Sequence, residues 1–175
     1  RAVSMDQDVQ RAMEIAAVCN NARIERPTHR KPMSKGIAVS GEPTEAALAV
    51  LAMKGGVEYD RSGCTLLKEL PFDSRRKMMS VLVRTRTGEL MMFTKGAPDI
   101  LLQRCAFVQK NGSVSAMTPS MRQSILKQNE EMASQAMRVL ALCWRKISGS
   151  FDTSEQNLVF CSLAGMIDPP RKEAF

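Results

Sequence analysis

Apolar positions recur with a helical period near the start of the chain. The segment from Asp6 to about Asn21 places its apolar residues on one side, which predicts an amphipathic helix. Ser4 and Gln7 have the spacing of a capping box, in which the two side chains satisfy backbone amides at a helix start. The residues that form the apolar side are Val9, Met13, Ala16 and Ala17.

A second helix is predicted after a polar interval. Ala22–Ser40 is interrupted by prolines and glycine and is predicted to be a long loop. Pro43 suits the first position of a helix, because its fixed φ fits the helix and its missing N–H has no partner there anyway. This helix is predicted to end at Gly55-Gly56.

From residue 64 onward the pattern is typical of strands separated by short turns. Thr85–Gly88 and Asn111-Gly112 have the composition of hairpin turns. Two helices interrupt the strands: Pro98–Arg104, and a longer one that Thr118 caps and that lasts to about Ala136. The predicted strands are Cys64–Leu70, Lys77–Arg84, Glu89–Lys95, Phe107–Lys110, Val114–Met117, Val139–Ile147 and Leu158–Ile167.

This order of elements predicts an α+β fold. Consecutive strands are joined mostly by hairpins and helices come in separate blocks, which favours an antiparallel sheet of about six to seven strands flanked by helices. Asp168-Pro169-Pro170-Arg171 cannot continue a strand and is interpreted as a boundary. The length of 175 residues fits one domain.

Composition narrows the classes of function. The net charge of +7 suits either a nucleic-acid or membrane surface or a small polyanion such as ATP. Basic residues are scattered apart from Arg75–Lys77, and aromatic residues are only 5%, so a small anion is favoured over nucleic acid. No apolar run reaches the roughly 18 residues of a membrane span, and residues 1–11 do not resemble a signal peptide.

Metal and triad chemistry are not expected. The chain has five cysteines without a C-x-x-C pair and a single histidine, His29, in a polar stretch, so no zinc site is predicted. The cysteines are interpreted as reduced packing residues. No nucleophile–base–orienter set and no glycine-rich phosphate loop is visible, so no catalytic residue is proposed.

Phe72 and Lys77 form the first candidate site. Phe72 follows a predicted strand, where an exposed ring could stack on a purine, and Lys77 could reach a phosphate as a point charge. The alternative is a core phenylalanine followed by a solvated basic turn, and the spacing alone favours that alternative.

Lys95 and Gly96 form the second candidate. Lys95 ends an apolar strand, where a half-buried ammonium would need an anionic or aromatic partner, and Gly96 would let a ligand approach the backbone closely. The alternative is an ordinary strand–turn–helix junction with an exposed lysine.

The remaining candidates lie at the second helix and at a late strand. Glu42, Thr44 and Glu45 begin the helix, where acids favour the helix dipole or could accept a hydrogen bond from the amino group of adenine. Arg138 begins a strand and could clamp a phosphate, although on its own it has no special feature.

Taken together, six segments resemble the nucleotide-binding domain of P-type ATPases in order and spacing. The Lys-Gly-Ala-Pro-Asp and Asp-Pro-Pro-Arg segments are the most specific. The chain is most similar to type II pumps, and within them to calcium pumps, with sodium/potassium-type and other cation pumps as an alternative. The segments are Ala17 to Ala22, Gly41 to Leu48, Pro71 to Ser80, Lys95 to Asp99, Arg138 to Leu142 and Gly165 to Arg171.

The resemblance implies roles for ten residues. Phe72 would stack on adenine, Lys95 and Gly96 would line its pocket, and Glu45 would contact its edge with Glu42 and Thr44 nearby. The resemblance further implies that Lys77 and Arg138 hold the phosphates and that Met79 and Leu140 form apolar walls. Some relatives have an arginine two residues after the stacking Phe. Here Ser74 holds that position and Arg75 follows, so a phosphate role for Arg75 stays open.

The family's Asp-Lys-Thr-Gly-Thr phosphorylation motif does not occur in the sequence. The resemblance therefore implies that residues 1–167 bind ATP without hydrolysing it and that residues 168–175 are a hinge toward a phosphorylation domain. Mg²⁺ would be bound mainly outside this chain. The expected partners are ATP and the phosphorylation, actuator and transmembrane domains of a pump, at the cytoplasmic side of a membrane, with a monomeric chain and no nucleic acid. The alternatives are an interaction module without nucleotide affinity and a self-sufficient hydrolase.

Overall fold

A computed structural model of the chain describes residues 6–25, 38–57, 63–149 and 152–167. Seven of its strands form one sheet in the order β3-β4-β5-β8-β9-β6-β7, and β1 and β2 form a separate small sheet. The strands are β1 (Arg23–Glu25), β2 (Ala38–Ser40), β3 (Cys64–Asp73), β4 (Met78–Thr85), β5 (Leu90–Gly96), β6 (Cys105–Lys110), β7 (Ser113–Ala116), β8 (Met137–Ile147) and β9 (Leu158–Ile167). The predicted α+β class and strand number are confirmed.

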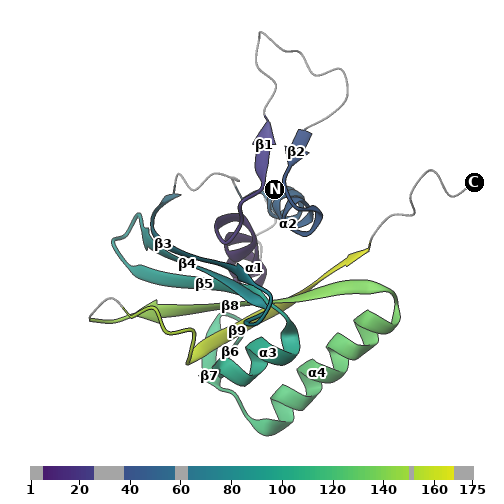
Figure 1. The fold of residues 1–175 in the computed structure, drawn as a ribbon. Coiled ribbons are helices and arrows are strands. Elements are labelled where there is room, and N and C mark those ends of the chain that lie inside the picture. Colours follow the sequence, from purple (N-terminus) through teal and green to yellow (C-terminus); the bar gives the residue numbers. More distant parts are fainter. Residues whose placement is uncertain (1–5, 26–37, 58–62, 150–151, 168–175) are drawn as a thin grey trace, which may run out of the picture.

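The described part of the chain contains four helices, which cover both faces of the large sheet (Figure 1). Helices α1 (Gln7–Val18) and α2 (Pro43–Lys54) lie on one face, whereas α3 (Pro98–Arg104) and α4 (Pro119–Ser134) lie on the other. The start of α2 at Pro43 and of α3 at Pro98 agrees with prediction.

Two hydrophobic cores result, one on each face. Met79 and Val81 of β4 pack into the α1–α2 core, while Met78 and Leu82 pack into the α3–α4 core. The alternation follows from the pleat, which turns successive side chains to opposite faces. Central strands covered on both faces therefore have almost no polar positions, which accounts for the apolar run of β4.

One strand pair departs from the antiparallel pattern. β6 pairs with β9 in parallel, and all the other strand pairs of the large sheet are antiparallel. The reason is the connection through α3, which carries the chain from β5 past the positions of β8 and β9 before β6 begins. Hairpin signals in the sequence cannot reveal this parallel pairing, because it joins segments about 50 residues apart, with Cys105 opposite Leu158.

Two local predictions were wrong. The interval Ala22–Ser40 contains β1 and β2, which pair from Arg23 opposite Ser40 to Glu25 opposite Ala38. Strands of three residues are too short for an alternation to be recognised. Helix α1 begins at Gln7 with Asp6 as its N-cap, so the capping box at Ser4 was placed too early. Ser4 itself, His29 and the predicted hinge 168–175 lie outside the described residues.

The cysteines are mostly packing residues, as predicted. Cys19, Cys105, Cys143 and Cys161 are buried, and Cys64 is half-buried; all five are free thiols. Burial raises the pKa of Cys143 well above its ordinary value and that of Cys161 to about 12. Within the described residues no helix has the length and apolar character that crossing a bilayer requires.

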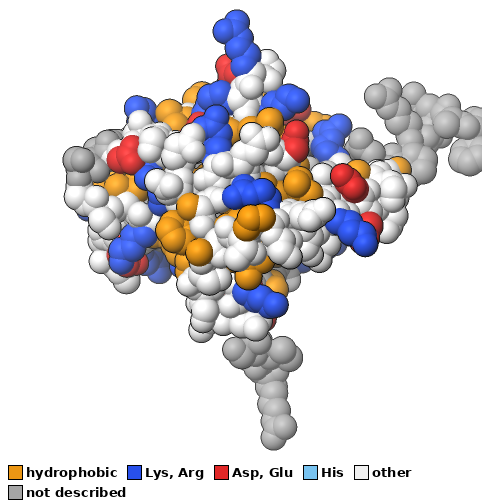
Figure 2. Space-filling view, turned by 90° about the horizontal axis from the view of Figure 1, so that it is seen from below, with side chains coloured by type: hydrophobic (Ala, Val, Ile, Leu, Met, Phe, Trp, Pro, Cys, Tyr) orange, Lys and Arg blue, Asp and Glu red, His pale blue; other side chains and the backbone are white. Residues whose placement is uncertain are grey.

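The face formed by α3 and α4 is shown in Figure 2, where exposed hydrophobic side chains occur in small groups between polar and basic ones. Phe107, Val114 and Met121, on β6, β7 and α4, are among the exposed apolar residues of the described chain. Scattered exposed apolar residues are normal on a protein surface and do not by themselves define an interface.

Candidate functional site

Several strands end or begin together along one edge of the large sheet, namely the edge formed by the ends of its strands. β3 ends at Asp73, β4 begins at Met78 and β5 ends at Gly96. The register places Met79 opposite Lys95, and Lys95 in turn opposite Leu142 of β8. This edge therefore brings together the candidate segments around residues 72–79, 95–96 and 138–142, which are far apart in the sequence.

Lys95 is buried and paired. Its side chain is 7% exposed, and its Nζ donates to Oε1 of Glu45 at 2.7 Å. Glu45 lies in the first turn of α2 and is 17% exposed. A half-buried lysine at the end of an apolar strand was expected to need an anionic or aromatic partner. Glu45, which the sequence also predicted to be part of the site, is that partner. The alternative of an exposed Lys95 is wrong.

Asn20 holds the start of α2 in place, and sequence reasoning gave it no role in the site. Its side chain is almost fully buried and donates to the carbonyl oxygens of Ala16 at 3.0 Å and Glu45 at 2.8 Å. Its own Oδ1 accepts from the backbone N–H of Ala22 at 2.9 Å. A buried asparagine with both ends satisfied fixes the position of its neighbours. Asn20 thus positions the residue that pairs with Lys95.

Arg138 contacts the first turn of the same helix. Its Nη1 donates to Oγ1 of Thr44 at 2.7 Å. Arg138 lies three residues before Ala141, the partner of Gly96, and with a rise of about 3.4 Å per residue it is roughly 10 Å beyond the end of β5. Glu42 is the N-cap of α2 and is exposed, without a side-chain capping bond. The predicted residues at the start of α2 and the predicted Arg138 are therefore in contact through Thr44.

The ring of Phe72 is 64% exposed. The sequence alone favoured a core phenylalanine, and that interpretation is wrong. β3 continues to Asp73, but its pairing with β4 passes directly from Leu70 opposite Ser80 to Asp73 opposite Met78. Pro71 and Phe72 therefore stand in a bulge, which breaks the alternation that would have turned the ring inward.

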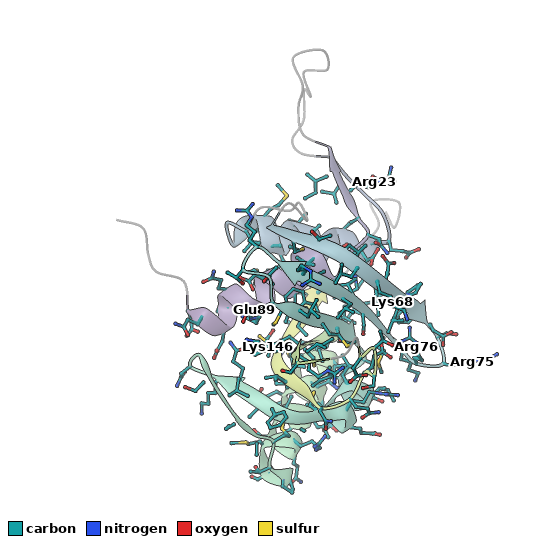
Figure 3. All side chains as sticks on the ribbon, turned by 90° about the vertical axis from the view of Figure 1, so that its left-hand side faces the viewer. Arg23, Lys68, Arg75, Arg76, Glu89 and Lys146 are labelled. Atoms are coloured by element: carbon teal, nitrogen blue, oxygen red, sulfur yellow. The ribbon has the colours of Figure 1, made fainter. Side chains whose placement is uncertain are left out.

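The turn after Phe72 is held by its own polar groups. Oδ1 of Asp73 accepts from the backbone N–H groups of Arg75 at 2.8 Å and Arg76 at 3.0 Å. These hydrogen bonds, with that from Arg76 the stronger influence, hold the pKa of Asp73 below its ordinary value. Lys77 is exposed and adopts a left-handed backbone with φ of 54°. Figure 3 shows Arg75 extending outward at this turn, whereas Arg76 lies closer to the sheet.

Gly96 is required by packing within the chain. A Cβ at this position would lie 2.5 Å from the carbonyl oxygen of Lys77 and 2.7 Å from Cβ of Met78. The same Lys77 carbonyl accepts from the N–H of Ala97 at 3.0 Å. The space beside Gly96 is therefore filled by the turn that follows Phe72, a reason for glycine that is independent of any ligand.

The two predicted apolar wall residues differ in exposure. Met79 is 1% exposed and belongs to the core beneath the site, whereas Leu140 is half-buried at its surface. Both lie on the face of the sheet that α1 and α2 cover.

A further ion pair, which sequence reasoning missed, anchors the same turn. Nη1 of Arg76 lies 2.6 Å from both carboxylate oxygens of Glu155, a residue of the β8–β9 connection. The Glu155 side chain is 7% exposed. A single glutamate in a polar loop carries no sequence signal for such a role, because 79 residues separate it from Arg76.

A cavity of about 430 Å³ lies at the opposite end of β3 and β4. It is lined by Arg11, Glu14, Val18, Val57, Gly63, Cys64, Thr85, Arg86, Thr87 and Phe93, and none of the ten predicted site residues is among them. The Arg11 guanidinium already has partners within the chain, because it pairs with Glu14 at 2.8 Å and lies 5.0 Å from the centre of the Trp144 ring. The candidate site is therefore placed where the bulge with Phe72 and the buried Lys95–Glu45 pair lie on either side of Met79, and not at this cavity.

A family match defines the class of protein. Residues 8–173 match the family described as P-type ATPase, cytoplasmic domain N. The chain belongs to this family.

Curated relatives are calcium-transporting ATPases. The chain is 34% identical over 98% of its length to the "Calcium-transporting ATPase" of Bacillus subtilis (strain 168), of which it covers 19%. It is 34% identical to the human "Calcium-transporting ATPase type 2C member 2" over 93% of its length, covering 16% of that protein. With "Calcium-transporting ATPase 2, endoplasmic reticulum-type" of Arabidopsis thaliana the identity is 29% over 97%, covering 20%. The chain thus spans about a fifth of the length of these relatives.

Proposed function

We propose that this chain is the ATP-binding module of a P-type cation pump and that the transported ion is calcium. The observation that carries the proposal is the exposed Phe72 ring at the same sheet edge as the buried Lys95–Glu45 pair. Family membership and the names of the relatives support it further.

Adenine is held by stacking on Phe72. A ring left 64% exposed at a bulge costs burial energy that a core position would have provided, and stacking on a base recovers about 1–3 kcal/mol. Neighbouring strands are about 4.8 Å apart, so Lys95, two strands from β3, is at roughly 10 Å, a distance suited to the edge of a purine stacked on Phe72.

The base is selected by the pair of charges. Glu45 is fixed by Lys95 and by the bond from Asn20 to its carbonyl oxygen. The carboxylate accepts from the exocyclic amine of adenine, and guanine presents a carbonyl oxygen there instead. Thr44 and Glu42 border the same helix start.

The phosphates extend toward the basic residues at the rim. Lys77 is exposed at the turn and Arg138 lies beyond the end of β5, where each can meet an anionic oxygen. The chain's net charge of +7 favours approach of the polyanion. Arg75, which extends outward from the turn, is a less constrained candidate for the same role.

Phosphoryl transfer takes place elsewhere in the pump. The chain binds ATP at the cytoplasmic side of a membrane. Because its sequence does not contain the phosphorylation motif, it presents the γ-phosphate to an aspartate of another domain. Mg²⁺ is held mainly by that other domain. Affinity of the chain by itself is weak, with a Kd on the order of 0.1 to several mM.

An NMR titration of the chain with ATP and, separately, GTP tests the proposal. We expect ATP to shift the amide signals around Phe72, Lys95 and Glu45, and GTP to produce smaller shifts at the same concentration. An absence of ATP-induced shifts at these residues would contradict ATP binding and favour the alternative of an interaction module without nucleotide affinity. Phosphate release from ATP above background by the pure chain would contradict the division of labour.

A further inference from the structure

We propose that Glu155 is a positioning residue that sets the orientation of Phe72 through Arg76. This inference rests on the proposed function, since it concerns the same adenine-binding ring. Glu155 lies outside the segments that carry the family resemblance, and its side chain faces away from solvent.

Glu155 is held from three directions. Nη1 of Arg76 lies 2.6 Å from each of its carboxylate oxygens, and Oγ of Ser80 donates to Oε1 at 2.6 Å. Ser80 also shares a hydrogen bond of 2.9 Å with Thr94 on the next strand. The main-chain oxygen of Glu155 accepts from Nη1 of Arg104 in α3. A buried carboxylate whose two oxygens both accept hydrogen bonds, and whose main chain is also held, is a rigid anchor.

Arg76 connects this anchor to the residue before Phe72. Its Nη2 donates to the carbonyl oxygen of Pro71 at 2.5 Å, while its Nη1 contacts Glu155. One planar guanidinium therefore spans the distance between a fixed carboxylate and the bulge. Arginine can do this because its donors diverge in a fixed fork, which a lysine ammonium lacks.

The bulge needs such support. Pro71 and Phe72 stand between the pairs Leu70–Ser80 and Asp73–Met78, so regular strand pairing does not fix their backbone. On the other side of Phe72, Asp73 accepts two backbone N–H groups of the turn. Phe72 is thus bracketed by the Arg76–Pro71 contact and by the Asp73 turn, and only the first of these depends on a distant residue.

The consequence is preorganisation of the stacking surface. A ring that is exposed and free to adopt several orientations loses conformational entropy on stacking, whereas a ring on a fixed backbone loses less. Glu155 contributes to ATP affinity in this way without contacting the nucleotide. Its effect should therefore appear both in binding and in the order of the ligand-free turn.

Glu155→Gln in this chain tests the inference, because it removes the charge and keeps the side-chain volume. We expect a Kd for ATP about 5- to 10-fold higher, measured by NMR titration at a temperature where circular dichroism shows the chain folded. Without ATP, backbone relaxation should show greater motion at Phe72 and Ser74 but not at Lys95. Arg76→Lys should give the same pattern, and it provides the answer if Glu155→Gln fails to fold.

Asp152→Asn is the matched control. Asp152 lies in the same connection and accepts from Arg145 at 2.8 Å, but it does not contact the turn. This variant should leave the Kd for ATP and the motion at Phe72 unchanged. Glu155→Asp should recover part of the lost affinity, since the charge returns.

The outcomes separate the two proposals. If the unsubstituted chain binds ATP and both Glu155→Gln and Arg76→Lys bind it equally well, the positioning role is overturned and the proposed function stands. The same holds if only the thermal stability of these variants falls. If the unsubstituted chain shows no ATP-induced shifts, the proposed function fails, and the positioning role fails with it.

Discussion

The ammonium of Lys95 and the carboxylate of Glu45 lie 2.7 Å apart, although 50 residues separate them in the chain. The contact joins the end of β5 to the first turn of α2, so it ties the sheet to the helix at the candidate site. Removing one member leaves the other buried and unpaired, which usually costs more than the pair contributes as a whole.

Lys95→Met should therefore destabilise the chain by about 3 kcal/mol, because the Glu45 carboxylate loses its partner at 17% exposure. The double variant Lys95→Met/Glu45→Gln should recover part of this loss. Urea unfolding followed by circular dichroism measures both. As a control, Lys127→Met breaks an exposed pair with Glu131 and should change the free energy of unfolding by less than about 0.5 kcal/mol. Equal effects of Lys95→Met and Lys127→Met would contradict the structural role of the buried pair.

Phe72→Ala should reduce ATP affinity by at least about 10-fold while changing the free energy of unfolding by less than about 1 kcal/mol, since the ring is mostly exposed. Phe93→Ala provides the contrast: this ring is 3% exposed, and its loss should cost about 3–5 kcal/mol. ATP titration and urea unfolding of both variants distinguish stacking from packing. A large loss of stability in Phe72→Ala would restore the interpretation of a core phenylalanine.

Gly96→Ala should destabilise the chain by about 1–3 kcal/mol, because the added methyl group would meet the Lys77 carbonyl oxygen at 2.5 Å. At Gly63 the nearest atom to a new Cβ is 3.7 Å away, so Gly63→Ala should be close to neutral and serves as the control. Thermal unfolding of both variants is the measurement. A neutral Gly96→Ala would mean that the turn after Phe72 moves freely and is not packed against Gly96.

Acid should weaken the contact between α1 and the β6–β7 hairpin. Burial raises the pKa of Asp8, but hydrogen bonds from Gly112, Gln109 and Asn111 together outweigh burial and hold this pKa below its ordinary value. A carboxyl group whose pKa is lower in the folded state stabilises the fold above its unfolded pKa, and this contribution is lost as the pH falls through the lowered value.

Asp8→Asn should accordingly be less stable than the unsubstituted chain at pH 7, and the difference should shrink as the pH falls from 5 to 3. Urea unfolding at a series of pH values measures it. Asp6→Asn is the control: Asp6 is the N-cap of α1, and asparagine keeps that capping function, so this variant should follow the unsubstituted chain. A difference that stays constant with pH would show that Asp8 is not stabilised as a carboxylate.

Sequence patterns predicted the local structure well where the physical signal is local. The starts of α2 and α3 follow from Pro43 and Pro98, and the hairpins follow from short turns between apolar segments. Local signals could not predict β1 and β2, which are too short, or the parallel pairing of β6 with β9, which depends on a connection through a helix.

For the site, the sequence by itself determined which chemical groups are available and that Lys95 requires an anionic partner if it is half-buried. Only the tertiary structure decided that this partner is Glu45, that Phe72 is exposed, and that Gly96 accommodates the Lys77 carbonyl. It also introduced Asn20, Arg76 and Glu155: the contact of Asn20 with Glu45 spans 25 residues, and that of Arg76 with Glu155 spans 79. Such contacts depend on strand order and on a bulge, and these arise from the packing of the whole sheet.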